Sequence, residues 1–240
     1  MKIRIKFRKY GIMKFIGHLD IMRYFQKAMR RADIDICYSA GFSPHMIMSF
    51  ASPLGVGLTS DGEYLDIEIG NELSSEAAVK RLNGVMAEGV EVLSFRRIPE
   101  EKSSNAMSLV AAADYEVRFR ENSLPEGCVF GNGLEEKWAA FCAQEQILVT
   151  KKTKKGEREL DLKPLIYEAR CQEDSIFLQL SAGSAENVKP ELVLEAFAAF
   201  ADFTLPEFAL LLHRKELYAN LAAEGEPRRL ASLEDLGEEF

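Results

Sequence analysis

Residues 2–32, KIRIKFRKYGIMKFIGHLDIMRYFQKAMRRA, contain two different spacings of apolar side chains. Ile3, Ile5 and Phe7 alternate with basic residues, which is the pattern of a strand with one buried face. In residues 18–32 the apolar side chains recur every three or four positions instead, which predicts an amphipathic helix. A strand followed by a helix therefore opens the fold.

The same two spacings continue to about residue 98. Strands are predicted at residues 45–51, 63–69 and 90–98, and a second helix is predicted from residue 74 or 75 to about residue 86. The order strand, helix, strand, strand, helix, strand is the ferredoxin-like arrangement of an antiparallel sheet with helices on one face.

The second half repeats this rhythm loosely after a polar, punctuated stretch. Residues 99–113 are predicted to be a linker with a short apolar helix. Strands are predicted at residues 115–120, 147–152, 157–162 and 175–180, and helices at 134–144 and 190–201. Residues 213–220 fit either a last strand or the end of a helix. We therefore predict an α+β protein of two tandem ferredoxin-like domains, residues 1–98 and 114–220, followed by a partly ordered acidic tail at residues 221–240.

The overall composition is that of an ordinary globular protein, with 47% hydrophobic and 28% charged residues in a chain of 240. No apolar run approaches the ~20 residues that a membrane span requires, and the N-terminus lacks a signal-peptide core. This predicts a cytoplasmic protein without a membrane partner. Cys37, Cys128, Cys142 and Cys171 are too scattered for a local zinc or iron–sulfur site, so we expect reduced thiols, no metal and no cofactor.

The charge is distributed unevenly along the chain. Residues 1–50 contain ten Lys or Arg against three Asp, a net charge of +7, so the other 190 residues carry −15 of the total of −8. This asymmetry predicts that one face meets an anion, while the remaining surface keeps the protein in solution.

The predicted helix at residues 18–32 provides the clearest cationic surface. Arg23, Lys27 and Arg30 are spaced at i, i+4 and i+7, which places them on one helical face, away from Leu19 and the other apolar residues. Further cations that could join them in a phosphate-binding patch are Arg8, Lys9, Lys14 and Arg31. The alternative is a solvated helix exterior without a ligand.

Two glycine-containing loops follow this helix. They are YSAGFSPH at residues 38–45 and SPLGVG at residues 52–57. Glycine allows a backbone to approach a phosphate closely, and Tyr38 or Phe42 could stack on a base. Neither a P-loop nor a GxGxxG motif is present. Turn glycines with Tyr38 and Phe42 anchored in the core explain the loops equally well.

His18 and His45 are candidate acid–base residues, because they could approach one another and imidazole titrates near neutral pH. The alternative is that both are structural. His18 and Asp20 are two positions apart, which on a helix argues against a shared metal. Asp66 and Glu68 alternate with apolar residues, so we assign their strand face to solvent and derive no carboxylate mechanism from them.

Two long stretches resemble the radical-SAM-linked family, a bacterial domain of unknown function. They are FRKYGIMKFIGHLDIMRYFQKAMRRA at residues 7–32 and CYSAGFSPHMIMSFASPLGVGLTSDGEYLDIEI at residues 37–69, and residues 107–119 and 213–218 are also similar. Members occur alone or fused behind a radical SAM protein, so the resemblance implies an accessory role around RNA or ribosome-linked modification. A radical SAM site needs three clustered cysteines, which this sequence lacks, so the resemblance implies a separate radical SAM protein as partner.

Three hypotheses follow. The first is an accessory RNA-binding or substrate-presenting module that works with a radical SAM enzyme. The second is an RNA-processing or RNA-modifying enzyme that uses His18 or His45. The third is a protein-interaction module whose basic face meets an acidic protein.

Overall fold

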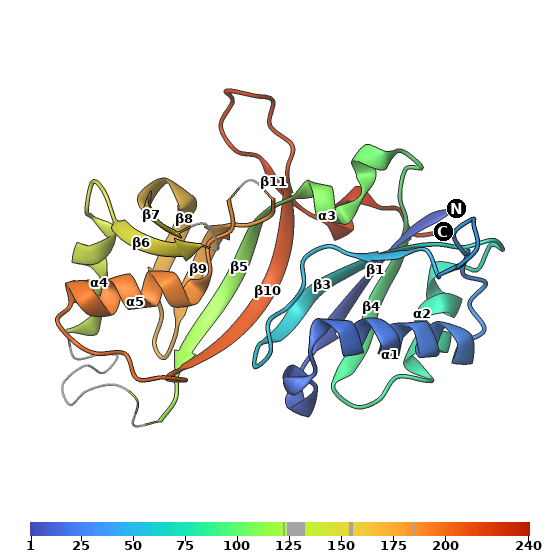
Figure 1. Ribbon diagram of the computed structural model, residues 1–240, viewed down its shortest axis with the longest axis horizontal. Helices are drawn as coiled ribbons and strands as arrows, with labels where there is room; N and C mark the ends of the chain where they lie inside the picture. The colour runs from blue at the N-terminus through green and yellow to red at the C-terminus, as the bar shows by residue number, and fades with distance from the viewer. Residues whose placement is uncertain (122, 124–132, 154–155, 185) are drawn as a thin grey trace. The chain divides into compact units, whose positions relative to one another are not determined.

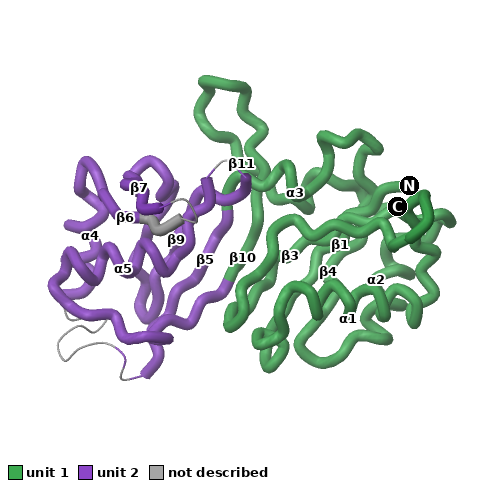
Figure 2. The backbone as a smooth tube through the Cα atoms, in the orientation of Figure 1, with its two compact units in different colours: residues 1–112, 214–240 green, residues 113–213 purple. Residues whose placement is uncertain are grey.

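The computed structural model describes residues 1–121, 123, 133–153, 156–184 and 186–240. Cys128, one of the cysteines expected to be a reduced thiol, lies outside the described residues. The chain forms two compact units, Met1–Ala112 with Arg214–Phe240, and Ala113–His213 (Figure 2). We refer to them as unit 1 and unit 2. None of the helices in the described ranges is long and apolar enough to cross a membrane.

Unit 1 contains an antiparallel sheet with the order β4-β1-β3-β10 (Figure 1). A short strand, β2, pairs with residues 65–67 of β3, and β11 pairs with the end of β10. The strands that lie wholly in unit 1 are β1 (Lys2–Lys9), β2 (Met48–Phe50), β3 (Thr59–Glu68), β4 (Val90–Arg97) and β11 (Leu230–Ser232). The chain passes between the units within β5 (Val110–Phe119) and β10 (Leu210–Asn220).

Helices α1 (His18–Arg31) and α2 (Ser75–Asn83) cover one face of this sheet (Figure 1). Ile3, Ile5 and Phe7 are buried there, as their alternation predicts. The Phe7 ring lies 4.7 Å from that of Phe25 in α1, and Phe25 lies 5.8 Å from Phe50 in β2. This aromatic contact fixes α1 on the sheet.

The remaining short elements of unit 1 lie at its loops. They are η1 (Gly11–Phe15), η2 (Lys102–Ser104), α3 (Ala106–Leu109) and η4 (Glu234–Leu236). Residues 221–240, expected to form a partly ordered acidic tail, instead belong to unit 1. Glu238 exchanges backbone hydrogen bonds with Arg97, and the Phe240 ring lies 6.3 Å from that of Phe95.

Unit 2 has a different arrangement. Its sheet has the order β5-β9-β8, and the backbone amide of Arg120 donates to Ala209, which links the end of β5 to the start of β10. A separate hairpin is formed by β6 (Leu148–Thr153) and β7 (Gly156–Asp161). The other elements are α4 (Leu134–Cys142), η3 (Lys163–Leu165), β8 (Ile166–Cys171), β9 (Ile176–Ser181) and α5 (Pro190–Phe200).

The core of unit 2 is aromatic. The Trp138 ring of α4 lies 4.9 Å from that of Phe197 in α5, and Phe141 lies 5.5 Å from the same ring. Edge-to-face contacts of this kind add to the area that the rings bury. The two helices of unit 2 are thereby packed together.

The predicted α+β class and the mostly antiparallel sheet are confirmed. Residues 2–97 follow the expected element order, and residues 213–220 lie in a strand. Strand β8 was not predicted, although Tyr167, Ala169 and Cys171 alternate in it with Glu168 and Arg170. The two units also differ from the predicted boundaries, because β10 returns to the first sheet. A tandem pair of ferredoxin-like domains stays a prediction.

Candidate functional site

Helix α1 presents a cationic outer face. Its buried residues are Ile21, Phe25, Ala28 and Met29, which recur at helical spacing and face the sheet. Arg23, Lys27 and Arg30 are exposed, as predicted. Leu19 was expected on the buried side, but its side chain is 62% exposed. It precedes Arg23 by one turn and therefore belongs to the outer face.

The cations of α1 differ in their partners. Arg23 forms an exposed ion pair with Asp20 at 3.1 Å, and Arg31 donates to the Val85 carbonyl at 3.2 Å. Within the described part of the chain, Lys27 and Arg30 form no ion pair. Arg30 and Arg31 lie in the last turn, where the helix dipole favours positive charge. Lys27 and Arg30 are thus the cations most open to an anion.

Three other cations of the predicted patch are placed differently. Arg8 is paired with Asp61 at 2.8 Å and lies near Glu91, and the hydrogen bond to Asp61 raises the pKa of Arg8. Lys9 is buried and donates to the Ile16 carbonyl at 2.7 Å. Burial lowers the pKa of Lys9, Glu63 opposes this shift and Arg214 adds to it. Lys9 is therefore unavailable to a surface ligand, and the prediction that it belongs to the patch is wrong.

Lys14 lies outside α1, in η1. It is half-buried, and its ammonium lies 5.2 Å from the centre of the Phe15 ring. This is a cation–π distance. The patch expected from the sequence is thus reduced to the outer face of α1, with Lys14 near its N-terminal end.

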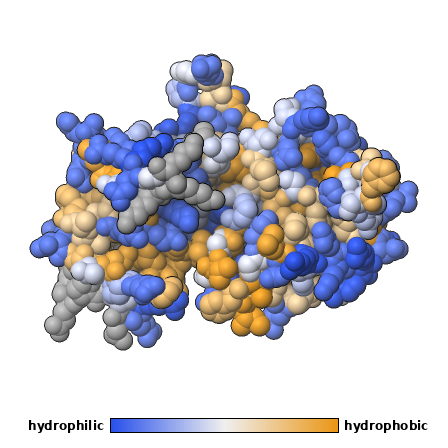
Figure 3. All heavy atoms as spheres, viewed as in Figure 1, coloured by the Kyte–Doolittle hydropathy of each residue, from blue (hydrophilic) through white to orange (hydrophobic). Residues whose placement is uncertain are grey.

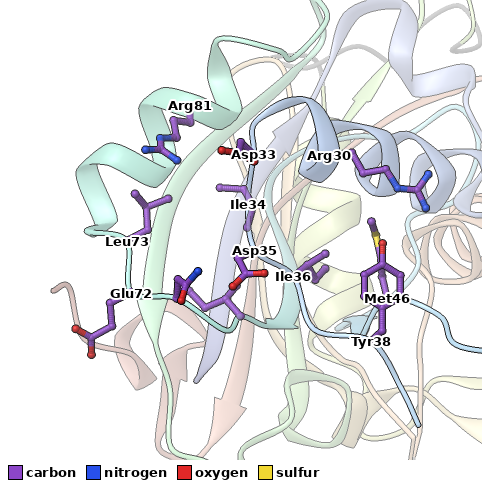
Figure 4. Close-up of a pocket in the computed structure, with 12 residues that line it drawn as sticks. Arg30, Asp33, Ile34, Asp35, Ile36, Tyr38, Met46, Glu72, Leu73 and Arg81 are labelled. Carbon is purple, nitrogen blue, oxygen red and sulfur yellow. The ribbon is translucent and has the colours of Figure 1, made fainter. Parts of the chain in front are cut away.

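A groove of about 480 Å³ lies at the C-terminal end of α1 (Figure 4). Arg30 and Tyr38 both line it, on the same side in Figure 4, so the structure brings together two residues that the sequence analysis linked only by function. The other charged residues that line it are Asp33, Asp35, Glu72 and Arg81. None of these charges is in an ion pair among the residues that the structure describes.

The groove combines two arginines, a tyrosine ring and three carboxylates. Its volume falls in the range of small-molecule pockets, roughly 300–1,000 Å³. Arg30 and Arg81 can neutralise a phosphate, and the half-exposed Tyr38 ring can stack on a base. Asp33 and Asp35 can accept hydrogen bonds from base amino groups. Asp33 and Asp35 could not be assigned to a site from the sequence, because the turn that follows α1 places them in the groove.

The loop after Tyr38 is a closed hairpin. Tyr38 and Met46 form an antiparallel bridge, and the Ser39 amide donates to the His45 carbonyl at 2.8 Å. Gly41 has φ of 111°, a conformation that favours glycine. The Phe42 side chain is fully exposed near the tip. Neither Tyr38 nor Phe42 is therefore a core anchor, and the alternative interpretation of this loop is wrong.

The two histidines occupy separate surroundings. His18 is half-buried, with its ring 5.1 Å from that of Phe50 on the α1 face of the sheet. His45 is exposed, lies 2.8 Å from the Ser39 hydroxyl through Nδ1, and lines a different groove of about 350 Å³. No cavity described in the structure contains both residues. The structure therefore does not bring them together.

The far face of the unit 1 sheet holds charges that the sequence analysis assigned to solvent. Arg4 is 1% exposed and forms a two-pronged hydrogen bond with Asp66, at 2.8 and 3.0 Å. Arg4 also donates to the carbonyls of Leu233 and Ser104. The expectation that Asp66 is exposed is wrong, because η2 and the C-terminal segment cover this face.

Two further buried groups of charges complete unit 1. Arg214 is 3% exposed and pairs with Glu63 at 2.5 Å on the α1 face of the sheet. On the far face, Lys6 donates to both Glu216 and Glu234 at 2.8 Å. Burial alone would lower the pKa of Lys6, but these two hydrogen bonds outweigh it and the pKa is raised. These arrangements are satisfied ion pairs, which fit a structural role.

No group of three or more metal-ligating side chains lies close together within the described ranges. Among the cysteines, Cys142 and Cys171 are half-buried, and burial raises the pKa of both thiols. They are the opposite of reactive thiolates, whose pKa is lowered. The candidate site is composed of cations, an aromatic ring and carboxylates.

Comparison with known proteins identifies one family and no activity. A search of curated proteins found no match. The family model described as "Uncharacterized protein conserved in bacteria (DUF2344)" matches residues 2–190, which include α1, the groove and the hairpin loop. That description states neither a substrate nor a partner. Because the match covers more than half of the chain, the protein belongs to the bacterial DUF2344 family.

Proposed function

We propose that unit 1 binds RNA and presents it to a partner enzyme. In this proposal the RNA backbone lies along the outer face of α1, and one base enters the groove beside Tyr38. The observation that carries the proposal is the position of Arg30, which belongs to the outer face of α1 and also lines the groove. A phosphate on Arg30 would place the adjoining base near Tyr38.

The charges support a polyanionic ligand. Lys27 and Arg30 are exposed without an intramolecular ion pair in the described ranges, so a phosphate need not displace a carboxylate from them. Asp33, Asp35 and Glu72 make the groove unsuitable for a second phosphate. They suit the amino and imino groups of a base, which donate hydrogen bonds. The groove thus favours a nucleotide with its phosphate at the α1 side.

The partner that we propose is a radical SAM enzyme. This part rests on the resemblance of residues 7–32 and 37–69 to the radical-SAM-linked family, together with the scattered cysteines of the chain. The protein would then hold the RNA while the chemistry takes place on the partner.

The test is the affinity for a short single-stranded RNA of mixed sequence, measured by fluorescence anisotropy over a range of salt concentrations. The test variant is Arg23→Gln/Lys27→Gln/Arg30→Gln. The matched control is Lys102→Gln/Lys189→Gln/Lys215→Gln, which removes the same charge from exposed sites elsewhere. Three lost phosphate contacts should reduce the slope of log K against log salt by about 2 in the α1 variant only. An equal change of this slope in the two variants would refute the outer face of α1 as the binding surface.

A second measurement tests the groove. Tyr38→Ala should weaken RNA binding by about 1–3 kcal/mol, because it removes the stacking ring, whereas Tyr38→Phe should retain most of the affinity. If Tyr38→Phe weakens binding as much as Tyr38→Ala, the ring does not act by stacking.

The alternative of an RNA-processing enzyme has one observation in its favour. His45 lies beside a groove of about 350 Å³, with the Ser39 hydroxyl 2.8 Å from its Nδ1 atom. A histidine in such a position can serve as an acid–base group. Incubation of the purified protein with RNA should give turnover that His45→Ala abolishes and His18→Ala retains. Absence of turnover by the native protein, with RNA binding intact, favours the presenting role.

A further inference from the structure

Four large apolar side chains are exposed around η1 and the start of α1. Ile12 is 79% exposed, Phe15 and Leu19 are each 62% exposed, and Val56 is 61% exposed. Figure 3 shows apolar side chains gathered at this end of unit 1. We refer to Ile12, Phe15, Leu19 and Val56 as the η1 patch. Contiguous apolar surface of this kind marks interaction sites on soluble proteins.

The backbone under the η1 patch is held by hydrogen bonds and close contacts. The Gly57 amide donates to the Lys14 carbonyl at 2.8 Å, which ties the Val56 loop to η1. A side chain at Gly17 would lie 3.8 Å from Val56, so this loop also borders the start of α1. The Tyr10 amide donates to the Gly89 carbonyl at 2.8 Å. The four apolar side chains therefore project from a fixed surface, which lowers the entropy lost on binding.

The charge around the η1 patch is positive. Lys14 is the only Lys, Arg, Asp or Glu in residues 11–19 and 55–58. Next along the outer face of α1 is Arg23, and Asp20 is the only acid of that helix. Because Arg23 is paired with Asp20, the cation that a partner covering the patch would meet is Lys14, which forms no ion pair in the described ranges.

We propose that the η1 patch docks a segment of a partner protein that combines apolar anchor residues with acidic flanking residues. Aliphatic side chains such as Ile12, Leu19 and Val56 gain most from burial against other apolar side chains, which RNA lacks. A second copy of the chain would place Lys14 and Arg23 opposite like charges. An acidic protein segment satisfies both the apolar centre and the basic edge.

This docking surface is distinct from the proposed RNA site. The η1 patch lies at the N-terminal end of α1, whereas Arg30 and the Tyr38 groove lie at its C-terminal end. RNA binding and partner docking can therefore be lost separately, and failure of one proposal leaves the other standing.

The experiment is site-specific photo-crosslinking of the full-length protein in the cells that naturally express it. The photoreactive residue p-benzoylphenylalanine replaces Phe15 in the test protein and Glu76, an exposed residue of α2, in the control. The cross-linked species is identified by mass spectrometry down to the attached peptide. We expect a cross-link from position 15 only, to another protein, on a peptide with apolar residues flanked by Asp or Glu.

Two charge variants make the result specific. Leu19→Asp should reduce the yield of the position 15 cross-link at least ~10-fold, as expected for an interface anchor. Phe208→Asp, which changes an exposed aromatic residue of unit 2, should leave it unchanged. Thermal unfolding of both variants shows whether they are folded. The proposal would be overturned if the species cross-linked to position 15 were RNA, lipid, a second copy of the chain or a peptide without acidic residues. It would also be overturned if position 15 gave no adduct.

Discussion

Two surfaces of unit 1 carry cations opposite a buried apolar face, but the environments of these cations differ. On β1, Arg4 and Lys6 alternate with buried apolar residues, and both are covered, with Arg4 only 1% exposed. On α1, Lys27 and Arg30 lie on the face opposite the buried residues Ala28 and Met29, and both are exposed. The difference arises because the C-terminal segment contributes Leu233 and Glu234 to the far face of the sheet.

This comparison shows what the spacing of apolar residues can reveal. It identifies which side chains share a face, because strands and helices have fixed periods. It does not reveal whether a later part of the chain covers the opposite face. Cations on the covered face acquire carboxylate partners, whereas cations on the open face keep their capacity for an outside ligand.

The largest effect should come from removing a buried cation. Arg4→Ala leaves Asp66 buried without its partner, so we expect a loss of about 3–5 kcal/mol in the free energy of unfolding. Urea denaturation followed by circular dichroism measures this loss. Arg4→Lys keeps the charge but not the two-pronged geometry, and should lie between the native protein and Arg4→Ala. A loss below ~1 kcal/mol for Arg4→Ala would contradict a buried ion pair.

The second test replaces a buried pair as a whole. Glu63→Leu alone should cost about 3–5 kcal/mol, because it leaves the Arg214 guanidinium buried and unpaired. Glu63→Leu/Arg214→Met should recover most of this loss, since both charges are then absent. A double-mutant cycle in urea measures the coupling between the two positions. Additive losses would show that the two charges do not stabilise one another.

A smaller effect should appear in the pH dependence of unfolding. Burial alone would raise the pKa of Glu234, but its hydrogen bonds to Lys6 and Ser94 outweigh it, and the pKa lies below the usual value of 4.5. The folded state therefore binds fewer protons than the unfolded state, and this stability is lost as the pH falls through the lowered pKa. Glu234→Gln should cost about 1–2 kcal/mol near neutral pH and flatten the acid side of the stability curve.

The free energy of unfolding at alkaline pH provides the matching measurement for Lys6. The pKa of Lys6 is raised above 10.5, so its contribution is complete below 10.5 and is lost as the pH rises through the folded value. Lys6→Met should flatten the alkaline decline and leave the acid side dependent on the remaining carboxylates. If neither limb of the curve changes in these two variants, the ion pairs of Lys6 are not formed in solution.

The smallest effect on stability should come from a substitution on the exposed outer face of α1. Lys27→Ala removes an exposed cation with no ion pair in the described ranges, so the free energy of unfolding should change by less than about 0.5 kcal/mol. The same variant should weaken RNA binding in proportion to one lost phosphate contact. A large loss of stability would show that Lys27 has a structural partner.

Much of the fold could be predicted from local pattern. The alternation at Ile3, Ile5 and Phe7 and the helical spacing at Phe25 and Met29 are properties of neighbouring residues, and both were confirmed. The missed features depend on contacts between distant parts of the chain. Asp66 is an example, because it is buried where η2 and the C-terminal segment cover its face of the sheet.

The candidate site was predictable only in its components. The sequence by itself determined that Arg23, Lys27 and Arg30 share a helical face and that a turn follows Tyr38, since both follow from short-range geometry. The tertiary structure decided that Arg30 and Tyr38 line one groove, that Lys9 is buried, and that Arg4 pairs with Asp66. Those outcomes depend on long-range packing. The groove joins Arg30 of α1 to Arg81 of α2, Lys9 lies near Glu63 of β3, and the C-terminal segment covers the far face of the first sheet.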